Sequence, residues 1–231
     1  MTALAGRVAL VTGASRGIGA AVAEAFGAAG ATVVRVARSL DDASHQAGLD
    51  IQADLTDTAQ VSKMAERVRT EAGVPDVVVH NAGGFLLKRL ADTTPAEFDE
   101  QVRVNLRAAF LVARELLPAM AALGRGTYVS VGSVADHVGF PENAAYAAAK
   151  YGLRGLHETL VAEYRGTGVR LTLVSPGPTD TSIWDPFDPD HRPGFPARAA
   201  MLRPSDVADA ILFVATRPPS VQVDWLRLGP V

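Results

Sequence analysis

The 231-residue sequence has no cysteine, and nowhere does it contain a long uninterrupted hydrophobic run. Without cysteine there can be neither disulfides nor thiolate metal sites, and a reducing intracellular compartment fits that absence. No stretch reaches the about 18 apolar residues that a membrane helix needs. No apolar region typical of a secretory signal precedes the first predicted strand. We therefore expect a cytoplasmic protein without a membrane partner.

A surplus of one charge sign is also missing. The 22 basic and 25 acidic residues leave a net charge of −3, with both signs scattered along the chain. The lack of a basic block argues against nucleic acid as a partner, and the lack of an acidic tail argues against disorder. We expect no metal site. Because 48% of the residues are hydrophobic, the chain can fill a sizeable core.

Short β-branched runs alternate with longer helical patterns along the sequence. Strands are predicted at 7–12, 32–36, about 49–53, 76–80, 127–131, 169–175 and 224–228. Helices are predicted at 18–29, 57–72, 95–123 with a kink near Pro118, 142–165 and 204–216. This alternation predicts one α/β domain over residues 1–231, a doubly wound parallel sheet with helices on both faces.

Two connections have unusual lengths. Residues 39–48 are too few for a full crossover helix, and we expect a single helical turn there. The irregular stretch 178–203 is rich in proline, aspartate and aromatic residues. A loop of this length in a compact domain is usually a lid or binding loop, or is disordered. We interpret it as a loop that covers a substrate, to which Trp184, Phe187 and Phe195 offer apolar contact or serve only as anchors.

A glycine-rich turn follows the first predicted strand, with the sequence Thr-Gly-Ala-Ser-Arg-Gly-Ile-Gly over 12–19. Gly13 permits a tight turn, Gly17 lets the backbone approach a pyrophosphate, and Gly19 lets the next helix pack closely on the sheet. The helix N-terminus would add unpaired N–H groups. The spacing differs from G-x-G-x-x-G, and turns attract glycine in any case. Its position between strand and helix is what favours phosphate binding.

Tyr146 and Lys150 are four residues apart and share one helix face, and Ser133 precedes the tyrosine by thirteen residues. A nearby ammonium lowers the pKa of a phenol, which is about 10 in a free tyrosine. Such a phenol can exchange a proton with a carbonyl or alcohol oxygen, and Ser133 can hydrogen-bond the same oxygen. A Tyr-x-x-x-Lys pair alone is typical of an exposed helix. However, Lys150 is one of only three lysines, with Lys63 and Lys88.

Asn105 breaks a local rule. Residues 94–97, Thr-Pro-Ala-Glu, predict a helix start with a capping box. Asn105 therefore lies well inside a helix, where asparagine is unfavourable. Broken local rules are often functional. The alternative is a polar helix residue with a satisfied partner.

In combination, these motifs resemble the classical short-chain dehydrogenases/reductases. Asn81-Ala82-Gly83 is similar to the turn that this family keeps after its fourth strand, and Pro176-Gly177 to the turn after its sixth. The resemblance extends from Gly6 to about Thr216. It implies a Rossmann-type domain that moves a hydride between NAD(P)H and a ketone, aldehyde or secondary alcohol.

The resemblance also implies roles for individual residues. The catalytic residues would be Asn105, Ser133, Tyr146 and Lys150, with Tyr146 as general acid/base, and Asn105 bending its helix. The cofactor would contact Gly13, Ser15, Arg16, Gly17, Ile18, Gly19, Arg38, Ser39, Asp54, Leu55, Asn81, Ala82, Gly83, Tyr146, Lys150, Pro176, Gly177, Thr179 and Thr181.

The end of the second predicted strand bears on the choice of nicotinamide cofactor. NAD-dependent proteins of this type usually place a carboxylate there, which bonds the ribose 2′-hydroxyl. Here Ala37 is followed by Arg38 and Ser39, and Arg16 lies in the glycine turn. Arginine can clamp a 2′-phosphate bidentately. We therefore expect NADP(H), with NAD(H) as the alternative; both arginines could also be ordinary surface residues.

Two departures from the family pattern stand out. Gly132 occupies a position where a second serine is common, and the C-terminus, 224–231, lacks the family's Val-Asp-Gly-Gly strand. We still expect a homo-oligomer, a dimer or tetramer. Three functions remain open: an NADP(H)-dependent oxidoreductase, an NAD-dependent alcohol dehydrogenase, or a non-catalytic cofactor-sensing protein on the same fold.

Overall fold

The computed structural model describes residues 2–40 and 48–231 of the chain. Their strands form one sheet in the order β3-β2-β1-β4-β5-β6-β7, and every neighbouring pair is parallel. The strands are β1 (Val8–Thr12), β2 (Thr32–Ala37), β3 (Gly48–Gln52), β4 (Val77–His80), β5 (Gly126–Val131), β6 (Val169–Pro176) and β7 (Trp225–Leu228). The order reverses direction between β1 and β4, where the carboxyl ends of the strands leave a crevice in folds of this kind.

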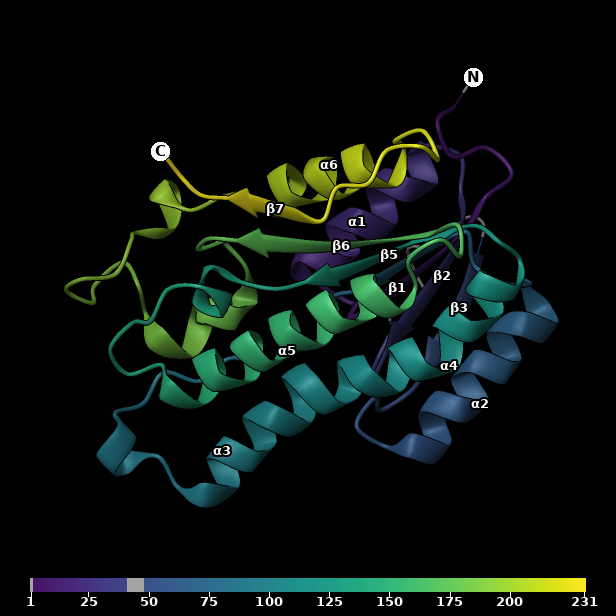
Figure 1. Ribbon diagram of the computed structural model, residues 1–231. Coiled ribbons are helices and arrows are strands. Elements are labelled where there is room, and N and C mark those ends of the chain that lie inside the picture. Colours follow the sequence, from purple (N-terminus) through teal and green to yellow (C-terminus); the bar gives the residue numbers. More distant parts are fainter. Residues whose placement is uncertain (1, 41–47) are drawn as a thin grey trace.

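Helices cover both faces of the sheet, as Figure 1 shows. One face carries α1 (Gly17–Ala28) and α6 (Pro204–Ala215), which pack against each other. The other carries α2 (Thr58–Glu71), α4 (Ala108–Ala122) and α5 (Ala144–Glu163). The expected doubly wound α/β fold is confirmed, because buried valine-rich strands such as β4 need apolar cover on both sides.

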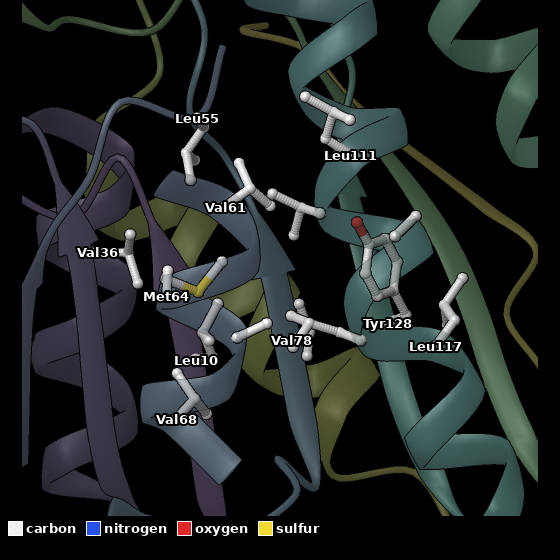
Figure 2. Packing of buried hydrophobic residues seen from close by; sticks show 14 of the residues in the cluster. Leu10, Val36, Leu55, Val61, Met64, Val68, Val78, Leu111, Leu117 and Tyr128 are labelled. Atoms are coloured by element: carbon white, nitrogen blue, oxygen red, sulfur yellow. The ribbon is translucent and has the colours of Figure 1, made fainter. Parts of the chain in front are cut away.

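The hydrophobic core is divided by the sheet into two clusters. Figure 2 shows the cluster under α2 and α4, where Leu10 and Val78 of adjacent strands meet Met64 and Leu117 of the helices. Leu55 also belongs to this cluster and is 6% exposed. Burying a side chain of this size contributes about 1.5–3 kcal/mol. This core fixes the carboxyl ends of the strands, from which the polar residues project.

The long predicted helix at 95–123 is interrupted, but not at the proline. Helices α3 (Pro95–Val102) and α4 are joined by a wide π-helical turn at Arg103–Arg107, while Pro118 lies inside α4. The break in the predicted helix therefore lies at Arg103–Arg107, and the kink near Pro118 stays a prediction. The irregularity is centred on Asn105, whose side chain takes hydrogen bonds that a regular helix would not offer.

The remaining connections are partly ordered. The 178–203 segment contains two short 3₁₀ helices, η5 (Ser182–Phe187) and η6 (Arg198–Ala200). The helical turn expected between β2 and β3 falls largely on 41–47, outside the described residues. Within the described parts of the chain, no helix is long and apolar enough to cross a membrane.

Candidate active site

The glycine-rich turn has the backbone geometry of a phosphate cradle. Gly13 and Gly17 have φ of 64° and 56°, which favours glycine. A Cβ on Gly19 would lie 2.2 Å from the Gly13 carbonyl oxygen, so α1 packs tightly on the turn. Among the described residues, the N-cap residue of α1, Arg16, makes no side-chain capping hydrogen bond, which leaves N–H groups at this helix start for an anion. The turn fits a dinucleotide pyrophosphate on its own geometry.

The turn after β4 braces this cradle. Asn81 donates from its amide nitrogen to the carbonyl oxygens of Thr12 and Gly13, at 3.2 and 3.3 Å. The Thr12 hydroxyl accepts hydrogen bonds from the backbone N–H groups of Asn81 and Ala82, at 3.0 and 3.1 Å. Asn81 and Ala82 thus join the carboxyl ends of β1 and β4. Gly83 follows them and faces Asn105, because a Cβ on Gly83 would lie 2.6 Å from the Asn105 oxygen.

The exposed end of β2 gathers the residues expected at the adenosine. Arg38 and Ser39 are exposed, as are Ser15 and Arg16 in the glycine turn. Across residues 2–40 and 48–231, neither Arg16 nor Arg38 is paired with a carboxylate. The charge of Arg38 helps to lower the pKa of Asp54, although hydrogen bonds from Thr56 are the larger cause.

Two of the residues expected at the cofactor, Leu55 and Ile18, have side chains that pack wholly or partly in the hydrophobic core. The Leu55 side chain is buried in the core, so only its backbone can face a ligand. Ile18 packs partly against the cluster under α1 and α6. Leu55 thus packs in the core under α2 and α4, whereas Ile18 packs beside the glycine turn on the opposite face.

The segment after β6 returns to the glycine turn. The Gly177 N–H donates to the Leu228 carbonyl oxygen of β7 at 2.7 Å, which anchors Pro176 and Gly177. Thr179 is buried and donates to the Gly177 carbonyl oxygen at 3.0 Å. A Cβ on Gly17 would lie 3.1 Å from the Thr181 methyl group, so Thr181 lies directly over the start of α1.

Ser133, Tyr146 and Lys150 converge at the carboxyl end of β5. The Lys150 ammonium donates to the Val131 carbonyl oxygen at 3.0 Å and lies 5.7 Å from the centre of the Tyr146 ring. Ser133 lies two residues after Val131, and its hydrogen bond to Tyr146 acts to lower the pKa of the phenol. A proton-bearing phenol, a hydroxyl and an ammonium are thus brought together by one helix and one strand end.

The direction of the tyrosine pKa differs from the expectation. Burial raises the pKa of Tyr146 to about 12, against the lowering by Ser133, and the charge of Asp136 raises it further. Burial lowers the pKa of Lys150 to about 8, which the charge of Asp136 opposes. Burial, followed by the charge of Lys150, lowers the pKa of His80 to about 3. Desolvation is the largest cause of the pKa shift in each of the three groups. Lys150 and His80 are buried, and Tyr146 is half-buried under its neighbours.

Asn105 is almost completely buried at the wide turn between α3 and α4. Its oxygen accepts from the Gly84 N–H at 3.1 Å, and its nitrogen donates to the backbone and side-chain oxygens of Gln101 at 3.1 and 3.2 Å. The side chain therefore ties the turn after β4 to the helix pair. These bonds satisfy the amide, as the alternative reading of this residue required.

An aromatic cluster covers Tyr146. The Phe85 ring packs edge-on at 4.8 Å from Tyr146, 5.1 Å from Trp184 and 5.4 Å from Phe187, between ring centres. Trp184 in turn meets Phe195 at 6.2 Å. Phe85 therefore joins the 178–203 segment to the phenol, and the surroundings of the phenol are largely apolar.

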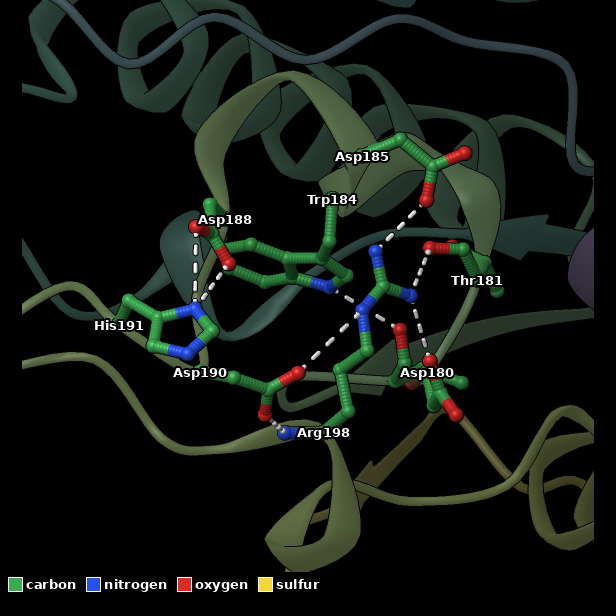
Figure 3. A network of polar contacts seen from close by, with 9 residues as sticks. Asp180, Thr181, Trp184, Asp185, Asp188, Asp190, His191 and Arg198 are labelled. Atoms are coloured by element: carbon green, nitrogen blue, oxygen red, sulfur yellow. Dashed lines mark hydrogen bonds and ion pairs between the residues drawn. The ribbon is translucent and has the colours of Figure 1, made fainter.

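Ion pairs hold the 178–203 segment in shape. Arg198 lies among Asp180, Asp185 and Asp190, with nitrogen–oxygen distances of 2.8, 2.6 and 4.0 Å, as Figure 3 shows. Arg192 pairs with Glu142 just before α5. Arg198 thus links three of the aspartates of this segment.

Sequence reasoning treated Glu142 only as the start of the predicted helix 142–165, whereas α5 begins at Ala144. Its carbonyl oxygen accepts from the Lys88 N–H at 2.7 Å, and its carboxylate also approaches Arg89 at 3.5 Å. With φ of 63° it occupies a conformation that is unusual for a residue other than glycine. Glu142 thus joins its own segment to residues 88–89 and to Arg192. In the sequence, only the neighbouring Pro141 indicates a turn there.

Comparison with known proteins supports an assignment to a family. The model of the short chain dehydrogenase family matches residues 7–192. The chain belongs to the short-chain dehydrogenase family. A curated short-chain relative, the 3-oxoacyl-(acyl-carrier-protein) reductase FabG of Escherichia coli (strain K12), is 34% identical over 223 residues, which cover 91% of this chain and 90% of the relative.

Solved structures lead to the same short-chain dehydrogenase fold. An alcohol dehydrogenase from the archaeon Thermococcus sibiricus, complexed with 5-hydroxy-NADP, superposes with a TM-score of 0.86 at 29% identity, covering 97% of both chains. A metagenomic short-chain oxidoreductase in complex with NADP superposes with a TM-score of 0.83 at 33% identity, covering 99% of both. The chain is thus a member of an oxidoreductase family that uses nicotinamide cofactors and acts on CH–OH or C=O groups.

Proposed function

We propose that this short-chain dehydrogenase is an NADP(H)-dependent oxidoreductase that interconverts an apolar ketone or aldehyde with its alcohol, with Tyr146 as general acid/base. The observation that carries the proposal is the convergence of Ser133, Tyr146 and Lys150 at the end of β5, beside a glycine turn with an uncapped helix N-terminus. An aligned proton donor and a phosphate cradle are the two parts that carbonyl reduction requires.

The residues of the chain would divide the work as follows. The glycine turn and the N-terminus of α1 hold the pyrophosphate, and Lys150 bonds the ribose hydroxyls. A bound nicotinamide supplies or accepts the hydride. Ser133 holds the substrate oxygen, and Tyr146 gives that oxygen a proton during reduction or removes one during oxidation. With a pKa of about 12, the phenol of Tyr146 carries its proton at neutral pH, so it can act as the proton donor during reduction.

The preference for NADP(H) is supported by the charges at the end of β2. Arg38 and Arg16 are exposed and lack carboxylate partners among the described residues, whereas no carboxylate stands at Ala37. A 2′-phosphate would gain charge-assisted hydrogen bonds there. The dissociation constants of NADPH and NADH, measured by fluorescence, test this preference directly. Equal affinity would contradict it.

The substrate class follows from the cover over the phenol. We propose that 178–203 closes over the substrate, because its Trp184 and Phe187 pack on Phe85, which in turn packs on Tyr146. A cover built from aromatic rings favours an apolar compound as the substrate beside Tyr146.

A homo-oligomer remains part of the proposal. Its support is the pair of large aromatic side chains exposed on neighbouring faces, Phe110 of α4 at 48% and Tyr151 of α5 at 46%. Light scattering coupled to size exclusion measures the assembly, and a monomer at micromolar concentration would contradict it.

The decisive test is Tyr146→Phe in a screen of ketones, aldehydes and secondary alcohols with each cofactor. We expect turnover to fall by about 10²–10⁴-fold, while the affinity for NADPH changes only a few-fold. Tyr151→Phe, one residue after Lys150 on the same helix but exposed, is the matched control. Equal loss of turnover and cofactor affinity in Tyr146→Phe would show that the role of the phenol is wrong. Tight NADPH binding with silence across the whole panel would favour the cofactor-sensing alternative.

A further inference from the structure

A carboxylate is buried directly behind the catalytic serine. Asp136 ends η4 (Val134–Asp136), the short helix that begins after Ser133, and its exposed fraction is 0%. One carboxylate oxygen accepts from the Ser133 N–H at 3.0 Å and from the Ser175 hydroxyl at 2.6 Å. The other lies 2.7 Å from the His137 ring nitrogen Nδ1. A carboxylate without partners is costly to bury. The number of hydrogen bonds around Asp136 therefore indicates a definite role.

The surrounding residues are arranged to hold this carboxylate. Ser175, on β6, accepts a hydrogen bond from the indole N–H of Trp225 at 2.8 Å and so can direct its own proton to Asp136. A Cβ on Gly132 would lie only 2.2 Å from the Asp136 oxygen. Gly132 is the position at which this sequence departs from the family's second serine. The departure has a physical reason, because the Asp136 carboxylate fills the space that a side chain would need.

The groups that face Asp136 come from several elements. They are His137 after η4, Tyr146, Lys150 and His157 of α5, Ser175 of β6 and Trp225 of β7, whose ring lies against Arg154 and Arg227. His80 of β4 faces Lys150 from the other side and is held neutral by burial. Asp136 is therefore the negative charge that acts on both Tyr146 and Lys150.

We propose that Asp136 is a positioning residue for the reaction, which fixes the backbone at Ser133 and places a buried carboxylate close to Tyr146 and Lys150. This role rests on the proposed function of those two residues. The charge favours a protonated Lys150 and a protonated Tyr146, so it counteracts the effect of burial on the lysine and adds to it on the tyrosine. An apolar residue at 136 would leave the lysine to lose its proton near neutral pH.

The test is an NMR titration of Lys150 in the full chain, which needs no substrate. With only three lysines, ¹³Cε labelling gives few signals, and Lys150 is assigned by its loss in Lys150→Met. Its midpoint in the native chain is expected at about 8. In Asp136→Asn we expect the midpoint to fall by about one pH unit. Asp136→Ser, smaller and also neutral, should move it in the same direction and guards against a folding defect in the first variant.

Ser175→Ala is the matched control, since it removes the 2.6 Å hydrogen bond but keeps the charge. Its midpoint should stay near that of the native chain. In turnover, the alkaline limb of alcohol oxidation should shift to lower pH in Asp136→Asn and not in Ser175→Ala. A Lys150 midpoint that is unchanged in both neutral variants would overturn the proposal. A silent substrate panel with a shifted midpoint would count against the proposed function alone.

Discussion

The contact between Gly132 and Asp136 leads to a sharp prediction about stability. Gly132 does not have a positive φ, so alanine is compatible with its backbone. By itself such a change would stabilise the fold by about 0.4–1 kcal/mol, because it restricts the unfolded chain. In this fold, however, the new methyl group would lie 2.2 Å from the Asp136 oxygen, which must retreat by more than about 1 Å to reach an ordinary contact.

The cost of that retreat follows from the bonds that it breaks. The displaced oxygen accepts from Ser133 at 3.0 Å and from Ser175 at 2.6 Å. A hydrogen bond to a charged group contributes about 1.5–3 kcal/mol. Losing one to two of them, against the small gain in the unfolded state, gives an expected destabilisation of about 2–4 kcal/mol for Gly132→Ala.

A double-mutant cycle with Asp136→Ala isolates the contact. After the carboxylate, the nearest atoms to the methyl group are the ends of the Leu173 and Ser175 side chains, at 3.0 and 3.1 Å, which can give way. Gly132→Ala should then cost less than about 1 kcal/mol, a coupling of about 2 kcal/mol or more. Urea unfolding followed by tryptophan fluorescence measures each corner of the cycle.

Gly155→Ala provides the matched control for the glycine change. Gly155 lies inside α5, and a Cβ there would meet nothing within 4 Å. Alanine should therefore stabilise the helix by about 0.5–1 kcal/mol. If Gly132→Ala cost the same with and without the Asp136 carboxylate, the proposed contact would not be the cause, and the explanation of the glycine at 132 would fail.

Three further outcomes follow from the site. Arg38→Asp should weaken the binding of NADPH relative to that of NADH, so the ratio of the NADPH to the NADH dissociation constant should rise. Arg165→Asp, the same charge change at an exposed residue just after α5, should leave the ratio unchanged. An unchanged ratio in Arg38→Asp would exclude Arg38 as the 2′-phosphate clamp. Phe85→Ala should raise kcat/KM for bulky ketones relative to small ones, and it should move to lower pH the limb of alcohol oxidation on which activity rises with pH, because removing a ring 4.8 Å from Tyr146 lessens the burial that raises the phenol pKa; unchanged profiles would mean that Phe85 does not cover the phenol. His80 has a pKa of about 3 when folded and 6.5 when unfolded, so the unfolded chain binds the extra proton between these values and stability falls as pH drops through that window, by about 2 kcal/mol at pH 5; urea midpoints should show a shallower decline in His80→Gln, and equal slopes would contradict this origin.

Much of the fold was predictable because its signals are local. The strands follow β-branched runs, and the predicted β5 and β6 differ from the observed strands by a single residue at one end. The juxtaposition of Tyr146 and Lys150 follows from helical spacing alone. The resemblance pointed to Asn105 as the place where the long helix bends, but the bonds that make the wide turn could not be predicted, because the Asn105 oxygen accepts from Gly84 N–H in a distant loop and its nitrogen donates to Gln101.

The state of the phenol shows where local reasoning stops. From the sequence, Lys150 is the neighbour of Tyr146, and an ammonium should favour phenolate. In the fold, the same packing that brings them together also removes them from water, with Phe85 arriving from 61 residues away and Asp136 from behind. Burial raises the tyrosine pKa and lowers the lysine pKa, so it favours the neutral form of each group. An attraction between ammonium and phenolate is weaker as a result. The buried Asp136 carboxylate, which favours the charged form of Lys150, therefore has a role in the site. It is the one charge on the described chain that opposes this effect of burial at Lys150, and it lies at the residue whose significance only the three-dimensional contacts disclose.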